Sequence, residues 1–239
     1  MAIPPLPPSH DLVRLIRSNQ KETEEALLEY LRQKPIPWNY QRARSLSPFA
    51  YAQEVPLSAL KRACDAARMP QAGRTATWDV LQLVRMAGKG RSLQCHGMDD
   101  GFVSIRKDLS VRVAADFYFV ENRRATVLWL QPRRGYALTN RQLAIFGSLM
   151  RIALVKGNFV DANLEILDLS VPPDEAERQV RRLGLEDLPH VSEAEVTEGL
   201  QCVADAYDTI ARMDINWKEL RQRGKPKDRR DDQGDFFRE

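Results

Sequence analysis

Three polar residues in the middle of the chain, Asp116, Gln131 and Arg133, have types and spacing suited to phosphate chemistry. Asp116 interrupts an otherwise apolar stretch, where an ionised carboxylate is costly unless it is paired or bound to a metal. Alternate residues of a strand point to the same face, so an acid on one strand and an i, i+2 pair on its neighbour can converge. Metal-dependent cleavage of a phosphodiester needs carboxylates to hold Mg²⁺ and a cation to stabilise charge. Asp116 is therefore a candidate metal ligand, and the three residues together form a candidate catalytic site.

Two members of this trio depart from what cleavage requires. Gln131 is neutral, so it offers Mg²⁺ a carbonyl oxygen without the charge of a carboxylate. Arg133 is a fixed cation whose planar fork binds phosphate well but exchanges protons poorly. The trio therefore indicates either a degenerate site that binds a phosphate or an Asp116–Arg133 ion pair that ties two strands together.

Arg133 and Arg134 also have a separate interpretation. They precede Gly135 shortly before a predicted helix, where guanidinium groups and free backbone N–H groups favour an anion. Arg133 and Arg134 are therefore candidate residues for binding the phosphates of nucleic acid. The alternative is a solvated loop with an arginine at the end of the sheet.

The elements that must position these residues form a β-β-β-α-β unit. Period-2 alternation and polar turns predict strands over 102–106, 109–120, 125–133 and 163–170. The first three are expected to form an antiparallel meander, with Asp116 on the second strand and the Gln131–Arg133 pair on the third. Thr139 and Gln142 form a capping box that opens a buried helix, through which the fourth strand pairs parallel to one of the others.

Helices are expected on both sides of this unit. Apolar spacing, caps and breaks predict helices over 11–32, 56–68, 75–88, 139–156, 174–183 and 192–213. We expect an α/β (α+β) fold with a central mixed sheet flanked by N- and C-terminal helices. The expected domains are an N-terminal helical region 1–70, the α/β core 71–172, C-terminal helices 173–216 that pack on the core, and a charged, disordered tail 217–239.

The order helix, three strands, helix, strand resembles the core of the PD-(D/E)XK (restriction-endonuclease-like) nuclease superfamily over roughly residues 75–170. In that family an Asp on the second strand and a Glu-x-Lys pair on the third bind metal and assist the attack. Asp116 matches the family Asp, preceded by Ala115 instead of Pro. Gln131 stands where the acid belongs and Arg133 where the Lys belongs. The resemblance implies a nucleic-acid protein with a degenerate motif, and Mg²⁺ as the cofactor if one is bound.

Composition narrows the class of protein. The hydrophobic share of 43% allows a sizeable core, and the net charge is only +3. The three cysteines are odd in number and widely spaced, which fits a reducing cytosol and argues against a disulfide framework or a structural zinc site. No apolar run approaches the roughly 20 residues that span a bilayer. We therefore expect a cytoplasmic protein without a membrane partner.

Three functions remain open at this level. The leading hypothesis is a catalytically degenerate nuclease-like protein, not an active enzyme, that binds DNA, RNA or a protein partner. The second is a non-catalytic interaction protein or homo-oligomer that works through the predicted surface helices 11–32 and 192–213. The third is an active Mg²⁺-dependent nuclease in which another carboxylate, Asp79 or Glu121, replaces the missing acid.

Overall fold

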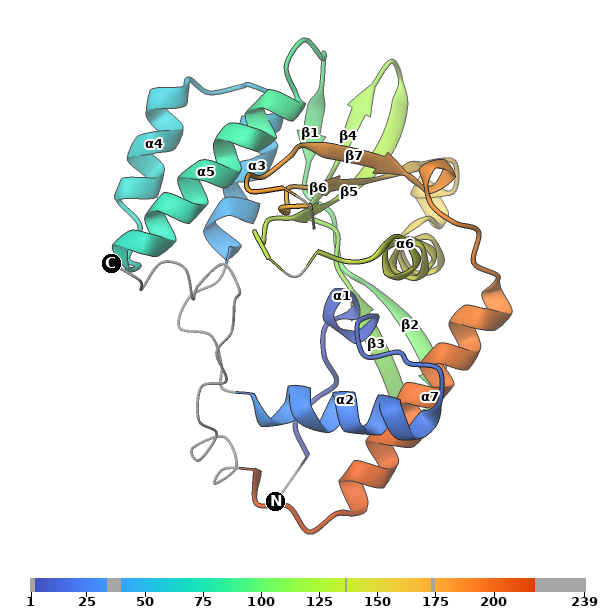
Figure 1. Ribbon diagram of the computed structural model, residues 1–239. Helices are drawn as coiled ribbons and strands as arrows, with labels where there is room; N and C mark the ends of the chain where they lie inside the picture. Colours follow the sequence, from blue (N-terminus) through green and yellow to red (C-terminus); the bar gives the residue numbers. More distant parts are fainter. Residues whose placement is uncertain (1–2, 34–39, 136, 173–174, 218–239) are drawn as a thin grey trace.

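A five-stranded mixed sheet with helices on both faces forms the centre of the molecule (Figure 1). The computed structural model describes residues 3–33, 40–135, 137–172 and 175–217. The strands of the main sheet are β1 Gln94–His96, β4 Phe117–Glu121, β5 Arg124–Gln131, β6 Asn163–Asp168 and β7 Arg181–Gly184, in the order β1-β4-β5-β6-β7. Neighbours are antiparallel except for β5 and β6, which run parallel. The predicted α/β fold with a mixed sheet and flanking helices is confirmed.

Alternation along β5 builds a separate core on each face of this sheet. Val127 and Trp129 join the apolar cluster that contains α6 (Asn140–Leu154), whereas Leu128 and Leu130 join the cluster on the opposite face. The opposite face is covered by α3 (Gln41–Tyr51) and α5 (Gln71–Ala87), and α4 (Leu57–Asp65) packs on α5. A strand buried on both faces reads as a nearly continuous apolar run, as β5 does.

The predicted meander is wrong in one respect. The stretch 109–120 does not form one strand but divides into β3 (Leu109–Val113) and β4, and β3 pairs with β2 (Gly101–Arg106) in a separate two-stranded sheet. The break falls at Asp116, whose carboxylate accepts a hydrogen bond from the Leu130 N–H. The Asp116 side chain therefore accepts the Leu130 N–H in place of a backbone carbonyl, and the ladder between β4 and β5 ends there. The unpredicted strand β1 supplies the third antiparallel member of the main sheet.

The main sheet nevertheless keeps the expected order of elements. Leaving out the β2–β3 hairpin, the chain runs α5, β1, β4, β5, α6, β6, which is one helix, three strands, one helix and one strand. The capping box of Thr139 and Gln142 opens α6 as predicted. β6 then pairs parallel to β5, as a crossover through a helix requires.

Two of the predicted helical segments differ in the structure, and one helix was not predicted. The predicted helix 11–32 is divided into α1 (Ser9–Leu12) and α2 (Gln20–Arg32), because Asn19 caps α2 by accepting from the Glu22 N–H. α3 was not predicted, since it has no capping side chain and contains Pro48. The predicted helix 174–183 is wrong, because the chain there extends into β7, an edge strand on β6. The predicted tail beyond residue 217 lies outside the described residues.

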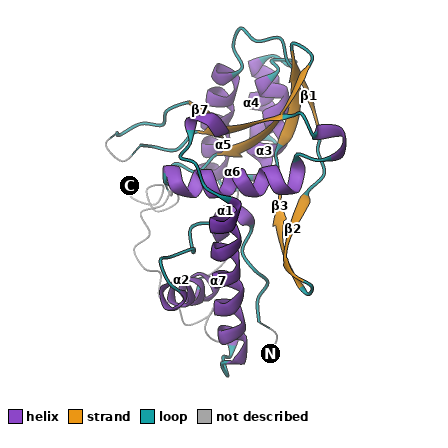
Figure 2. Ribbon diagram, turned by 90° about the vertical axis from the view of Figure 1, so that its right-hand side faces the viewer, coloured by secondary structure: helices purple, strands orange, loops and turns teal. Residues whose placement is uncertain are grey.

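α2 and α7 (Glu193–Arg212) pack together beside the sheet (Figure 2). The capping box of Ser192 and Glu195 opens α7 as predicted. The first half of α7 belongs to the same apolar cluster as Trp129 and α6, and its second half packs with α2. Two single 3-10 turns, Gly157–Phe159 and Leu185–Asp187, complete the regular structure of the described residues. No helix in the described ranges is long and apolar enough to cross a membrane.

Candidate functional site

Asp116 is held at the entry to β4, with its side chain only 3% exposed. Arg44 of α3 donates from Nη1 to both carboxylate oxygens at 2.7 Å. The Leu130 backbone N–H donates to Oδ2 at 2.6 Å. The carboxylate thus accepts three hydrogen bonds and lies against a guanidinium, which is how a buried charge is normally satisfied.

Gln131 and Arg133 stand at the carboxyl end of β5. Gln131 is 2% exposed and lies on the same face of the strand as Trp129, two residues earlier. Its Oε1 accepts a long hydrogen bond of 3.4 Å from the Arg133 backbone N–H. The Arg133 side chain reaches Asp11 in α1, with Nη1 2.9 Å from Oδ1 and Nη2 3.5 Å from Oδ2. Asp116 and Arg133 therefore take different partners.

The α1 segment lies over this end of the sheet. The ring of His10 lies 5.7 Å from that of Trp129, and the Arg44 guanidinium lies 5.8 Å from the same ring. Asp11 also accepts from the Tyr30 hydroxyl at 3.3 Å. His10 of α1 and Arg44 of α3 thus lie beside Trp129. The same two helices also supply the ion-pair partners of the predicted site, Asp11 for Arg133 and Arg44 for Asp116.

Burial and charge act in opposite directions on the two titratable residues of α1. Burial lowers the pKa of His10 to about 4, despite the attraction of the neighbouring Asp11 carboxylate. Burial alone would raise the pKa of Asp11, but the charges of His10, Arg133 and Arg14 outweigh it and hold that pKa below its usual range. Near neutral pH the segment therefore presents a neutral imidazole and an ionised carboxylate to its surroundings.

The end of β6 continues the same polar region. Asp168 is paired in register with Gln131, is fully buried, and accepts from the Ser170 N–H at 2.8 Å and from Arg181 of β7. Arg178 donates to the carbonyls of Pro132 and Leu169, at 2.7 and 3.0 Å, and so joins the segments that leave β5 and β6. Asp168, like Asp116 and Asp11, is thus paired with an arginine, whereas Arg178 binds backbone carbonyls.

Arg134 follows Arg133 at the end of β5 and donates to the carbonyl of Ala176 at 3.0 Å. Its own carbonyl accepts from the Val171 N–H at 2.8 Å. Of the two candidate phosphate residues, Arg134 is thus bound to the loop after β6 and Arg133 to α1.

The arrangement does not fit Mg²⁺. Both oxygens of Asp116 are engaged by hydrogen-bond donors, a cation lies against them, and Gln131 contributes no charge. Within the described ranges, no three or more His, Cys, Asp or Glu residues are grouped to hold a metal ion. We therefore derive no metal-dependent step from this site.

The two carboxylates considered as substitutes for the missing acid lie elsewhere. Glu121 ends β4, at the opposite end of that strand from Asp116, and hydrogen bonds from Arg91 hold its pKa below the usual range. Asp79 lies on α5, where burial raises the pKa of its carboxyl against the opposing charges of Arg178 and Arg134. Glu121 is therefore part of another ion pair, and no contact joins Asp79 to Asp116 among the described residues.

Comparison of this chain with models of protein families, with curated proteins and with solved structures gave no match in any of the three.

Proposed function

We propose that this protein is a catalytically inactive, nuclease-like α/β protein that binds nucleic acid without cutting it. One observation carries the proposal: Asp116 and Arg133, the two charged members of the predicted trio, are each ion-paired to a residue from another part of the chain. A carboxylate that accepts three hydrogen bonds beside a guanidinium has little to offer a metal ion.

The arrangement of the main sheet supports the nuclease-like part of the proposal. α5 covers one face and α6 the other, and the elements α5, β1, β4, β5, α6 and β6 follow one another in the resembled order. Asp116 directly precedes the second strand of this series and Gln131 ends the third. Fold alone does not determine an activity, so the proposed lack of cleavage rests on the ion pairs of Asp116 and Arg133.

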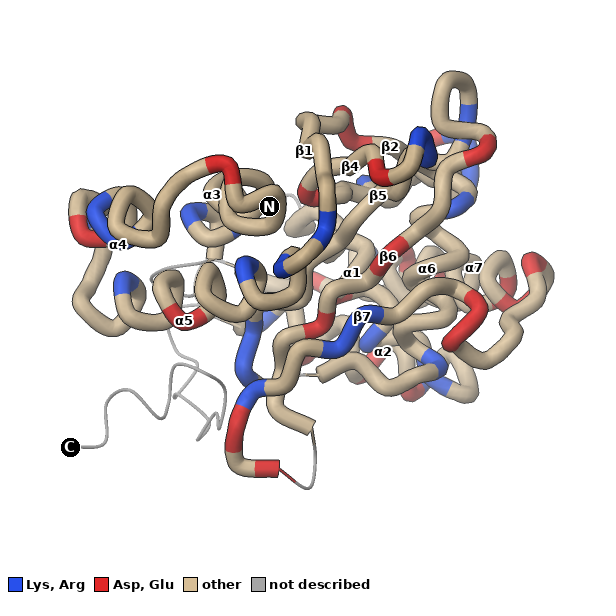
Figure 3. The backbone as a smooth tube through the Cα atoms, turned by 90° about the horizontal axis from the view of Figure 1, so that it is seen from above, with Lys and Arg blue, Asp and Glu red and all other residues tan. Residues whose placement is uncertain are grey.

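The distribution of charge supports nucleic acid as the partner. Residues 40–91, which include α3, α4 and α5, contain nine Lys or Arg and three Asp or Glu, a net charge of +6. Arg44 and Arg91 pair with Asp116 and Glu121 outside this segment, which leaves a net charge of +4. α2 and α7 together contain three basic and nine acidic residues, a net charge of −6. Figure 3 shows Lys and Arg recurring along α3, α4 and α5. A local basic layer favours phosphate backbones even where the whole chain is nearly neutral.

The proposal is tested by measuring binding and cleavage together. Labelled single- and double-stranded DNA and RNA are incubated with the full chain in Mg²⁺, Mn²⁺ or chelator, at 50 and 200 mM salt. We expect no cleavage under any condition, and binding that weakens as salt rises because phosphate contacts release counterions. Asp116→Asn keeps the shape of the side chain and removes its charge, so it serves as the variant for any cleavage that appears.

Two results would contradict the proposal in different ways. Metal-dependent cleavage that disappears in Asp116→Asn would make the protein an active nuclease despite Gln131. The absence of both binding and cleavage at 50 mM salt would remove nucleic acid as the partner, and the protein-interaction hypothesis would then be preferred. Arg133→Ala is less informative here, because it also leaves Asp11 without its main cation.

A further inference from the structure

A stripe of mostly basic and polar side chains, with one tryptophan, follows the outer side of α5. Arg74, Trp78, Gln82, Arg85 and Lys89 recur at spacings of three or four residues, and Lys89 lies just beyond the end of the helix. Residues at this spacing share one side of a helix, about 22 Å long from Arg74 to Lys89 at a rise of 1.5 Å per residue. The buried residues of α5, such as Val80 and Val84, face the sheet instead. α4 contributes Lys61, whose ammonium group lies 5.6 Å from the centre of the Trp78 ring.

The cations on this stripe lack acidic partners in the described part of the chain. Arg85 donates to the carbonyl of Val55 at 2.8 Å, and Arg74 donates to Gln71 and to the carbonyl of Met69. These bonds position the guanidinium groups without neutralising them. Lys61 differs, since it pairs with Asp65 at 2.8 Å. The arginines near Asp116 also differ, because Arg44, Arg133 and Arg181 each face an aspartate. Arg74 and Arg85 therefore keep a charge that Arg44, Arg133 and Arg181 share with their aspartates.

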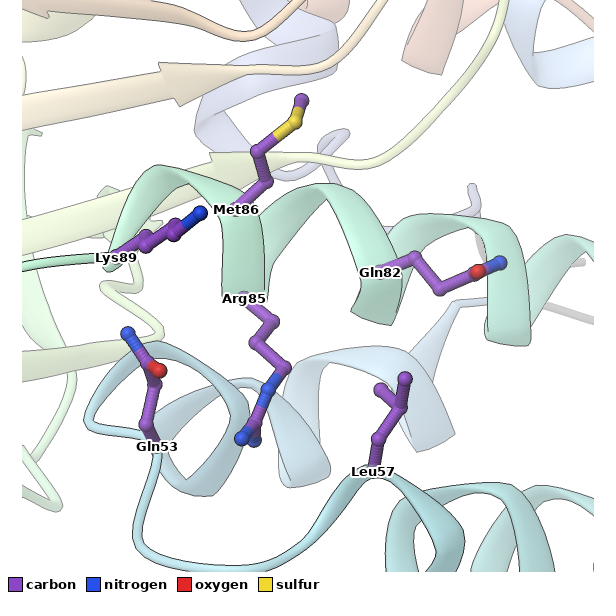
Figure 4. Close-up of a pocket in the computed structure, with 6 residues that line it drawn as sticks. All are labelled: Gln53, Leu57, Gln82, Arg85, Met86 and Lys89. Atoms are coloured by element: carbon purple, nitrogen blue, oxygen red, sulfur yellow. The ribbon is translucent and has the colours of Figure 1, made fainter.

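A depression of about 350 Å³ lies on this side of the molecule, between α5 and the turn that joins α3 to α4. It is lined by Gln53, Leu57, Gln82, Arg85, Met86 and Lys89 (Figure 4). In the close-up Arg85 extends from α5 toward the turn that carries Gln53 and Leu57. Two cations and two amide side chains are the donors that proteins use on phosphate oxygens. Two apolar side chains, Leu57 and Met86, are 40% and 56% exposed beside them.

We propose that the outer side of α4 and α5, defined by Lys61, Arg74, Gln82, Arg85 and Lys89, is the surface that binds the phosphate backbone of nucleic acid. This inference rests on the proposed function and locates it away from the degenerate trio. The depression is the phosphate seat of this surface, with Arg85 and Lys89 supplying charge and the amides of Gln53 and Gln82 lying beside them. The acidic helices α2 and α7 repel the same ligand.

The test compares the wild type with two double and two single variants of the full chain by fluorescence anisotropy, on labelled single- and double-stranded DNA and RNA between 50 and 200 mM salt. The test variant is Arg85→Gln with Lys89→Gln. The matched control, Lys21→Gln with Arg32→Gln, removes the same charge from exposed positions of α2. Arg134→Gln reports on the end of the sheet. Since Arg85 also bonds Val55, the single variant Lys89→Glu, at an exposed position, is measured as well, and thermal melting confirms folding.

We expect the test variant to bind roughly tenfold more weakly at 50 mM salt, with a slope of log affinity against log salt shallower by about 2. Lys89→Glu should weaken binding in the same direction, the α2 control should bind as the wild type does, and Arg134→Gln should weaken binding less than the α5 test variant does. If both α5 variants bind with the affinity of the wild type and Arg134→Gln loses binding, the inference is overturned and the proposed function is left standing. Equal competition by polyglutamate would also overturn it, because the surface would then accept any acidic polymer. A wild type that binds no nucleic acid would overturn both.

Discussion

At the scale of single residues, the candidate site is defined by its counter-ions. Asp116 and its partner Arg44 are 72 positions apart, and Arg133 and its partner Asp11 are 122 positions apart. The sequence singled out Asp116, Gln131 and Arg133, but only Gln131 lies in its predicted strand: Asp116 comes just before β4, and Arg133 lies two residues beyond the end of β5. It did not identify Arg44 or Asp11, because an ion pair over such separations has no periodicity or local spacing to reveal it. These partners decide the chemistry, since they turn a potential metal site into two ion pairs.

His10 gives the site a dependence on pH that can be measured. Its pKa is about 4 in the folded protein and about 6.5 in the unfolded chain, because burial disfavours the charged imidazole. The unfolded state therefore binds the proton first as pH falls, so stability is present above pH 6.5 and is lost between pH 6.5 and 4. We expect the free energy of unfolding to fall by roughly 2 kcal/mol between pH 7 and pH 5 from this residue alone.

Urea unfolding of the wild type and of His10→Gln at pH 7, 6 and 5 isolates this contribution. The difference in unfolding free energy between the two proteins should shrink or reverse as the pH falls, since glutamine does not titrate. His190→Gln, at an exposed position, is the matched control and should follow the wild type. A pH dependence that is the same in His10→Gln and in the wild type would show that the imidazole is solvated.

At the scale of elements, the helices that the sequence predicted best are those with a local signal at their start. α6 and α7 each begin with a hydroxyl cap and an amide or acid three residues later, a pattern that is visible without the structure. β7 was missed because its residues bond side chains of β6: Arg181 pairs with Asp168 and Arg182 with Glu165. α3 was missed because it lacks a capping side chain and contains a proline. Tertiary contacts, not local propensity, decide both.

Close packing between α3 and the end of α5 positions the proposed binding surface. A Cβ atom at Gly88 would lie 1.9 Å from the carbonyl oxygen of Tyr51, at the last residue of α3. That atom is backbone and cannot rotate away, so Gly88→Ala must push the two helices apart. We expect a loss of about 3 kcal/mol in unfolding free energy, at the upper end of the usual cost of overpacking. Urea unfolding measures it.

Gly90 supplies the contrast to this prediction. It has a φ of +78° and nothing within 4 Å of an added Cβ, so Gly90→Ala carries only the conformational cost of the left-handed region. That cost is about 1 kcal/mol. Equal losses in the two variants would mean that α3 and α5 separate easily. A small loss for Gly88→Ala would mean that the end of α5 that carries Arg85 shifts easily against α3.

At the scale of the whole molecule, opposite charges are gathered on different layers. The basic helices α3 to α5 lie on one face of the sheet, whereas the acidic pair α2 and α7 packs beside the other face, next to α6. The sequence could not show this polarity, because the net charge of +3 sums over both groups and the acidic helices come from opposite ends of the chain. We therefore expect the field of the molecule to favour the approach of a negatively charged polymer from the side of α4 and α5.

The same layers determine whether the expected core 71–172 can fold alone. That fragment would lose Leu12 and Val13, which are fully buried with Trp129, and Ala50 and Tyr51, which are fully buried on the opposite face. It would also lose Val203 of α7 from the first cluster. Cavities on both faces of the sheet each remove several kcal/mol, against a typical total stability of about 5–15 kcal/mol.

We expect fragment 71–172 to show no cooperative urea transition and to bind a hydrophobic dye such as ANS. Fragment 3–217, which keeps every described element, should unfold at the urea midpoint of the full chain. A cooperative transition in fragment 71–172 would instead make residues 1–70 a removable domain, and the ion pairs that Asp11 and Arg44 form would then belong to an interface between domains.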